Sequence, residues 1–272
     1  MPQSHQYVLG HADQELERLI DQARQIDPIT RRFFLEAGLA PGMRVLDVGS
    51  GAGDVSFLIA DLVGGSGEVV GVDRSPIAIR TANTRKASLK LPNVSFVEGD
   101  PAAMTFERPF DAVAGRYVLM FQPDPVAMLR GVARHLRPGG VMVFHEIDWH
   151  GARSHPPVPT YDRCCQWIKL ALAQSGADPH FGGTMAACMS AAGLPAAKLH
   201  VESTASAGPD LAEISKFTAD LTRSLLPAML RVGAATEKEI GVETLAGRSR
   251  QEMIEGNSSI TGRAEIGAWT RT

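Results

Sequence analysis

The chain has 272 residues, of which 44% are hydrophobic and 21% are charged, and its formal net charge is −3. These values are ordinary for a globular protein with one large core, and the charge offers no basic footprint to a nucleic acid. No apolar run reaches the about 18 residues of a membrane span, and the first residues lack an apolar signal segment. Three cysteines without C-x-x-C spacing favour a reducing compartment. We therefore expect a cytoplasmic protein without a membrane or nucleic-acid partner.

Residues 1–42 are predicted to form helices ahead of the main sheet. Apolar residues recur at helical spacing from Leu16 to Ile26, and a second helix is expected over about 28–37, ended by Gly38. Such helices either cover the edge of a sheet or close over a ligand, and the pattern leaves both roles open.

Residues 43–150 alternate short apolar runs with helical patterns, which predicts a doubly wound, mostly parallel sheet with right-handed crossovers. Ser75 and Asp124 each precede a proline and are expected to cap helices. The apolar runs that predict strands are 44–48, 67–73, 94–100, 110–116 and 136–144.

The alternation loosens after Gly151, although residues 151–272 are expected to belong to the same domain. Three prolines predict an extended loop over 151–159. The later segments predict helices over about 161–174 and 183–192, strands over 199–204 and 264–270, and helices between them over 210–255, broken near Pro227 and Gly233.

A glycine-rich turn follows the first strand, with Asp47 two residues before Gly49, Gly51 and Gly53. A dinucleotide fingerprint, G-x-G-x-x-G, requires its third glycine where this chain has Asp54. A short-chain dehydrogenase also needs Tyr-x-x-x-Lys, and none of the three tyrosines has a lysine at that spacing. The D-x-G-x-G-x-G pattern instead resembles the first motif of the class I S-adenosylmethionine-dependent methyltransferases.

Four further motifs strengthen this resemblance, which is specific over about residues 42–150 and loose elsewhere. Asp73 ends the second strand about 20 residues after the turn, where a carboxylate reaches a ribose diol. Asp100 follows the third strand, the fourth strand matches the family's, and L-x-P-G-G begins at Leu136.

The resemblance implies a seven-stranded Rossmann-like sheet with an antiparallel last strand, and S-adenosylmethionine as the cofactor, converted to S-adenosylhomocysteine. Asp73 would hold the ribose and Asp100 the adenine, while Tyr7 lies in a segment similar to the N-terminal lid of many small-molecule methyltransferases. The full set of implied cofactor residues is Asp47, Gly49, Gly51, Gly53, Asp73, Arg74, Gly99, Asp100, Pro101, Arg116 and Tyr7.

The candidate catalytic residues are His145, Asp148 and Tyr117. They lie at the ends of the fourth and fifth strands, where ligands bind in open α/β sheets, and one of them could act as a general base or hold the acceptor. Each could equally be a solvated polar residue. No metal site is expected, because metal-dependent catechol-type enzymes of the family carry acids where this chain has residues 115–117.

The resemblance therefore implies a methyltransferase acting on a small molecule, with oxygen favoured over nitrogen or carbon from the frequency of such acceptors in the family. The Asn/Asp-Pro-Pro-Tyr motif of base and amide methylation is absent. The alternatives are a sensor or scaffold that binds the cofactor, or another transferase that uses it. The lid, the 158–192 helices and the 210–255 insertion would enclose an apolar acceptor pocket. The alternative for the insertion is an oligomer interface, such as that of a homodimer.

Overall fold

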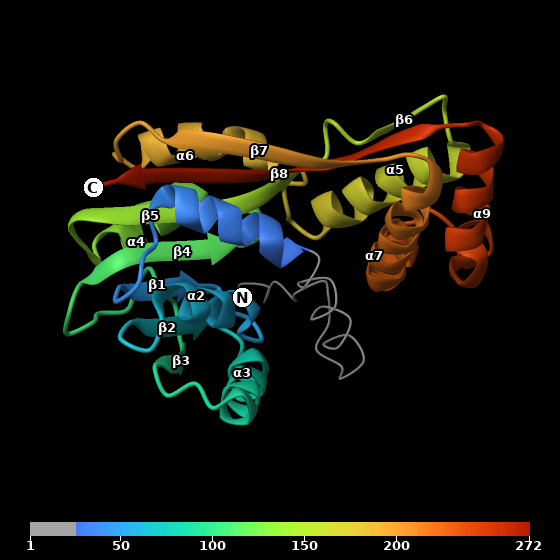
Figure 1. The fold of residues 1–272 in the computed structure, drawn as a ribbon. Coiled ribbons are helices and arrows are strands. Elements are labelled where there is room, and N and C mark those ends of the chain that lie inside the picture. The colour runs from blue at the N-terminus through green and yellow to red at the C-terminus, as the bar shows by residue number, and fades with distance from the viewer. Residues whose placement is uncertain (1–25) are drawn as a thin grey trace. The chain divides into compact units, whose positions relative to one another are not determined.

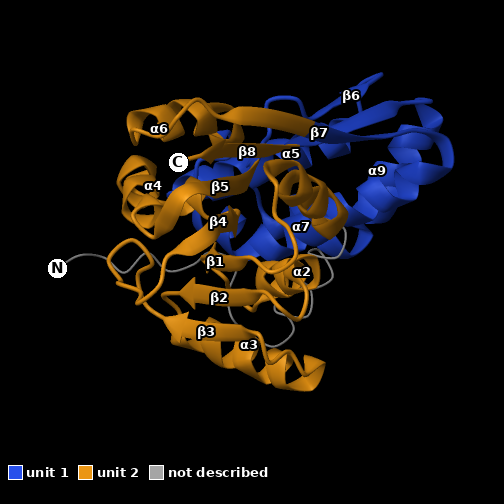
Figure 2. Cartoon of the chain, turned by 60° about the vertical axis from the view of Figure 1, so that its left-hand side comes forward, with its two compact units in different colours: residues 1–10, 147–180, 202–264 blue, residues 11–146, 181–201, 265–272 orange. Residues whose placement is uncertain are grey.

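The computed structural model describes residues 26–272, and these divide into two compact units (Figures 1 and 2). The first, here called the sheet unit, comprises residues 26–146, 181–201 and 265–272. The second, the helix unit, comprises residues 147–180 and 202–264. Tyr7 and most of the predicted lid lie outside the described residues.

Five parallel strands form the centre of the sheet unit, in the order β3-β2-β1-β4-β5. This order confirms the predicted doubly wound fold, and it reverses between β1 and β4, the switch point beside which such sheets bind ligands. β8 follows β5 in the sheet, and β7 pairs with β8. The strands are β1 (Arg44–Val48), β2 (Glu68–Asp73), β3 (Val94–Glu98), β4 (Phe110–Arg116), β5 (Leu136–Asp148), β7 (Lys198–Ser206) and β8 (Ser259–Arg271).

The helices of the sheet unit begin where the sequence predicts. The Ser75 hydroxyl accepts a hydrogen bond from the amide of Ala78, and the Asp124 carboxylate accepts one from the amide of Ala127, so both predicted caps are confirmed. The helices are 26–37, α2 (Asp54–Val63), α3 (Pro76–Leu89), α4 (Pro125–Ala133) and α6 (Met185–Ala191), with single turns η1 (Leu119–Phe121) and η2 (Phe181–Thr184).

One hydrophobic cluster joins the 26–37 helix and α2 to the central strands. Phe34 from the helix, Ile59 from α2 and Val45 from β1 are all completely buried in it. Each such side chain contributes about 1.5–3 kcal/mol by leaving water. The described part of the predicted lid is therefore a helix that packs on the sheet.

The helix unit contains the segment between β7 and β8, which is helical as predicted. No helix of the described residues combines the length and apolarity that a membrane crossing requires. The elements of the helix unit are β6 (Arg153–His155), α5 (Pro159–Gln174), η3 (Gly208–Asp210), α7 (Leu211–Arg231), α8 (Glu237–Ile240) and α9 (Val242–Glu255).

Two predictions for this unit are wrong. Helix α7 continues through Pro227, because the buried face of this long helix packs along α5 and α9 and offsets the hydrogen bond that proline removes. It ends at Arg231, near the predicted break at Gly233. The predicted loop over 151–159 also contains a short strand, in which Arg153 pairs antiparallel with Thr261 of β8. The backbone that the prolines hold extended is thus used for pairing.

Candidate active site

The glycine turn after β1 exposes backbone at a single position. Gly49, Gly51 and Gly53 all have positive φ, at 68°, 51° and 94°. A Cβ at Gly49 would lie 2.7 Å from Val118, and one at Gly53 would lie 2.8 Å from Phe57. At Gly51 a Cβ would meet nothing within 4 Å. Packing therefore explains two of the glycines, whereas Gly51 borders open space that a ligand could enter.

Asp73, at the carboxyl end of β2, clamps this turn. One carboxylate oxygen accepts the amide of Gly51 at 2.9 Å, and the other accepts the amide of Ser75 at 2.8 Å. An ionised carboxylate offers about four lone-pair sites, so Asp73 retains capacity for a diol beside the exposed turn.

Asp47 lies beneath the turn and is completely buried. Its Oδ2 accepts the Ser56 hydroxyl at 2.5 Å, while Oδ1 has no hydrogen-bond partner. Burial raises the pKa of Asp47 to about 7, against the Ser56 hydrogen bond and the positive charge of Arg116. Because Asp47 is completely buried and bonds to Ser56 of α2, a direct contact with a ligand would require the surrounding residues to move.

The next residues along this edge are joined by an exposed ion pair. Arg74 Nη2 lies 2.8 Å from Asp100 Oδ2, and Asp100 Oδ1 accepts the amide of Ala102. The amide of Gly99 donates to the carbonyl of Asp73. The Pro101 carbonyl accepts His135 Nε2 at 2.8 Å. The predicted ribose and adenine residues therefore lie on neighbouring strand ends.

A buried carboxylate joins two of the predicted catalytic residues. Tyr117 follows β4 with φ of 55°, an unusual value for a residue with a side chain. Its hydroxyl donates to Glu265 Oε2 at 2.6 Å, and His145 Nε2 lies 2.9 Å from the same oxygen. The side chains of His145 and Glu265 are 0% and 6% exposed.

The network continues from the opposite nitrogen of His145. Its Nδ1 lies 3.0 Å from Thr30 Oγ1, which also accepts Arg116 Nη1 at 2.9 Å. Arg116 forms an ion pair with Asp27 at 2.7 Å. Because the Thr30 hydroxyl donates to the backbone carbonyl of Ile26, its oxygen can accept from both neighbours. Arg116, Thr30, His145 and Glu265 thus form one continuous chain of hydrogen bonds.

Glu146 fixes the turn that follows Tyr117. Its Oε1 accepts the amides of Val118 and Leu119 at 2.9 and 2.7 Å, whereas Oε2 is buried without a partner. Burial raises the pKa of Glu146 to about 8, although these backbone donors oppose the shift. A partly protonated carboxyl group therefore holds this turn near neutral pH.

A family model described as a methyltransferase domain matches residues 39–177, about half of the chain. The chain belongs to the class I S-adenosylmethionine-dependent methyltransferases. It is 31% identical over 151 residues to the demethylmenaquinone methyltransferase of Lactococcus lactis, covering 55% of this chain and 58% of the relative. It is 33% identical over 132 residues to the Staphylococcus aureus enzyme of that name, covering 48% of this chain and 52% of the relative.

The chain thus spans somewhat more than half the length of these curated relatives. The structure of the YcgJ protein of Bacillus subtilis resembles this chain with a TM-score of 0.58 at 18% identity, covering 92% of this chain and 99% of that one. At that identity the likeness concerns the fold alone, and it agrees with the sheet order described above.

Sequence reasoning missed three members of the buried network around His145, namely Asp27, Thr30 and Glu265. Glu265 carried a signal, because it is a single acid within the apolar last strand, where an unpaired charge is costly. Asp27 and Thr30 carried none, since a polar residue on a helix is ordinarily solvated.

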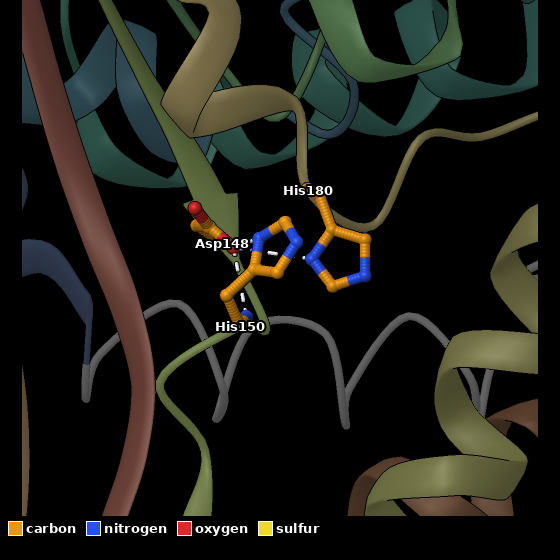
Figure 3. A group of neighbouring side chains, drawn as sticks. All are labelled: Asp148, His150 and His180. Carbon is orange, nitrogen blue, oxygen red and sulfur yellow. Dashed lines mark hydrogen bonds and ion pairs between the residues drawn. The ribbon is translucent and has the colours of Figure 1, made fainter.

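Asp148, the third predicted catalytic residue, belongs to the helix unit. Its Oδ1 accepts from Nδ1 of His150 and from Nδ1 of His180 (Figure 3). Burial alone would raise the pKa of Asp148, but hydrogen bonds from the His150 amide and both imidazoles hold it below its usual range.

Proposed function

We propose that this protein binds S-adenosylmethionine at the edge formed by the glycine turn, Asp73 and Asp100, and transfers its methyl group to a small molecule. The observation that carries the proposal is the turn itself. Gly51 borders open space while its amide is held by Asp73. A turn that leaves bare backbone beside a carboxylate fits a ligand that carries both a ribose diol and an amino-acid part.

Each part of the cofactor has a partner of suitable chemistry. Asp73 would accept the ribose hydroxyls and Asp100 the adenine amino group, while the backbone at Gly49 and Gly51 would receive the methionine part. Asp47 precedes the turn and, in its ionised form, would favour a cation nearby. The bound cofactor supplies a methyl group on a sulfonium, an electrophile that needs an aligned nucleophile at about 3–3.5 Å.

We assign the acceptor side to Tyr117, Glu265 and His145, and an oxygen acceptor is favoured. A hydroxyl group that attacks a methyl group must lose its proton. The Tyr117 oxygen could take that proton while passing its own to Glu265, to which it already donates. The imidazole of His145 would stabilise the carboxylate until then. A phenolic ring activated in this way could also accept the methyl group on carbon.

The curated relatives are named demethylmenaquinone methyltransferases. Naphthoquinols, the reduced forms of naphthoquinones, are therefore the first acceptors to test, together with simple phenols. Formation of S-adenosylhomocysteine together with a methylated product would support the proposal. Mass spectrometry and NMR of the product would distinguish O-methylation from ring methylation. If S-adenosylmethionine binds and no acceptor in a broad panel is methylated, the result favours the alternative function of a sensor or scaffold.

Calorimetry tests the cofactor assignment separately. Asp73→Ala should weaken S-adenosylmethionine binding by about 1.5–3 kcal/mol, the contribution of hydrogen bonds to a charged group. NADH, the control ligand, should not bind. The assignment fails if wild type prefers NADH or if the variant binds S-adenosylmethionine as well as wild type does.

A further inference from the structure

Two histidines and an aspartate meet in the helix unit, in a cluster that the proposed methyl transfer does not use. Asp148 ends β5, His150 stands in the turn that follows, and His180 lies beyond α5 (Figure 3). Nδ1 of His150 is 2.7 Å and Nδ1 of His180 is 3.1 Å from Asp148 Oδ1. One ligand atom from each residue lies within 4.8 Å of the other two.

Hydrogen bonding alone accounts poorly for this arrangement. The amide of His150 also donates to Asp148 Oδ1, at 2.8 Å, so three nitrogens converge on an oxygen with two lone pairs. The two imidazole rings have centroids 3.7 Å apart with a tilt of 38°. A single cation in place of the two Nδ1 protons would relieve this crowding at Asp148 Oδ1.

The distances suit such a cation. Tetrahedral zinc with nitrogen and oxygen ligands at about 2.0–2.2 Å holds its ligand atoms about 3.3–3.5 Å apart. The separation from His180 Nδ1 to Asp148 Oδ1, 3.1 Å, is close to this range, and the separation from His150 Nδ1, 2.7 Å, would have to lengthen by about 0.6 Å. The His150 side chain is 73% exposed, so a small rotation of this ring meets little resistance.

We propose that Asp148, His150 and His180 form a binding site for a divalent first-row transition metal, with the remaining positions open to water or to a ligand. Two imidazole nitrogens and one carboxylate oxygen suit zinc, iron, cobalt or nickel, whereas magnesium and calcium prefer oxygen ligands throughout.

The backbone holds the ligands in place before any ion binds. The amide of Trp149 donates to the carbonyl of Pro179 at 3.1 Å, joining the segment after β5 to the one that carries His180. The amide of His180 donates to the Asp178 side chain at 2.8 Å. A bound ion would add a second link between the same two segments. The sequence alone does not predict this site, because His180 follows Asp148 by 32 residues.

Zinc competition against a chromophoric chelator tests the site in the full chain. Wild type should bind one equivalent of Zn²⁺, and the affinity should fall at least about tenfold in His150→Ala and in His180→Ala, since even residues behind the ligands contribute about 10–100-fold. His155→Ala is the matched control, because His155 is an exposed histidine of the same unit. It should bind as wild type does.

Thermal unfolding and cobalt spectra complete the test. Zn²⁺ should raise the unfolding temperature of wild type and of His155→Ala but not of His180→Ala. All variants should unfold at the wild-type temperature without metal. The Co²⁺ complex should lack a thiolate charge-transfer band. The proposal is overturned if wild type binds no stoichiometric zinc, if the two ligand variants bind as tightly as the control, or if a thiolate band places the ion on cysteine.

Discussion

The cofactor edge and the buried network of the sheet unit are built in opposite ways. The edge consists of short consecutive stretches, with the turn at 49–53 held by Asp73 through backbone amides. The network consists of side chains from the 26–37 helix, β4, β5 and β8, which bond mainly to one another. The first construction leaves backbone open to a ligand, whereas the second fixes a chain of proton-carrying groups. We therefore expect changes at the edge to alter binding and changes in the network to alter turnover.

Glu265→Gln should produce the largest separation of these two effects. A glutamine retains the shape of the side chain but cannot receive a proton from Tyr117. Turnover should fall by about 10²–10⁴-fold, the usual contribution of general acid–base catalysis. The affinity for S-adenosylmethionine should remain within about twofold of the wild-type value. Glu107→Gln, an exposed glutamate of the same unit, is the control. Equal losses of binding and turnover would contradict the division.

Tyr117→Phe should give a loss of the same kind and of similar size. It retains the ring against His145 and removes the hydroxyl that donates to Glu265 and would receive the acceptor's proton. Steady-state turnover should therefore also fall by about 10²–10⁴-fold. Unchanged turnover would remove Tyr117 from the proton path.

Glu146→Gln sharpens the comparison through pH. The folded-state pKa of Glu146, about 8, exceeds its ordinary value of 4.5. At low pH the carboxyl group is protonated in the folded and the unfolded protein, so its ionisation does not affect stability. As the pH rises from about 4.5 to 8, the group ionises more readily in the unfolded protein, which destabilises the fold. The free energy of unfolding of Glu146→Gln should therefore increase relative to that of wild type over this range, by at most about 1.4 kcal/mol per pH unit.

Urea denaturation at pH 5, 6, 7 and 8 measures this difference. Asp47 has its own raised pKa, about 7, and contributes equally to both proteins. Glu107→Gln should follow wild type at every pH. Parallel profiles for Glu146→Gln and wild type would show that Glu146 titrates normally.

Arg74→Ala should have the smallest effect at the edge. Its ion pair with Asp100 is exposed, with the Arg74 side chain 59% accessible, and exposed pairs contribute about 0–1 kcal/mol. Calorimetric affinity for S-adenosylmethionine should therefore change by less than about fivefold. A larger loss would assign Arg74 a direct contact with the cofactor.

The sequence predicted the parts of the molecule whose conformation depends on residues adjacent in the chain. The glycine turn and the Ser75 and Asp124 caps follow from local patterns that the backbone must obey, and the alternation of strands and helices predicts the doubly wound fold. Glu265 and Thr30 could not be placed beside His145, because their positions depend on how β8 and the 26–37 helix pack. The prediction of a helix break near Pro227 was wrong for the same reason, since tertiary packing overrides the local preference of proline.

The most direct test of the cofactor edge is a calorimetric titration of S-adenosylmethionine into Gly51→Ala and Gly64→Ala. Both glycines have positive φ, at 51° and 67°, and a Cβ at either meets nothing within 4 Å. Both substitutions place a side chain at positive φ and should cost about 1–3 kcal/mol of folding stability each. If the space beside Gly51 receives the cofactor, only Gly51→Ala will lose affinity, by at least about tenfold, or 1.4 kcal/mol. Equal affinities in the two variants would contradict the assignment of this turn as the cofactor site.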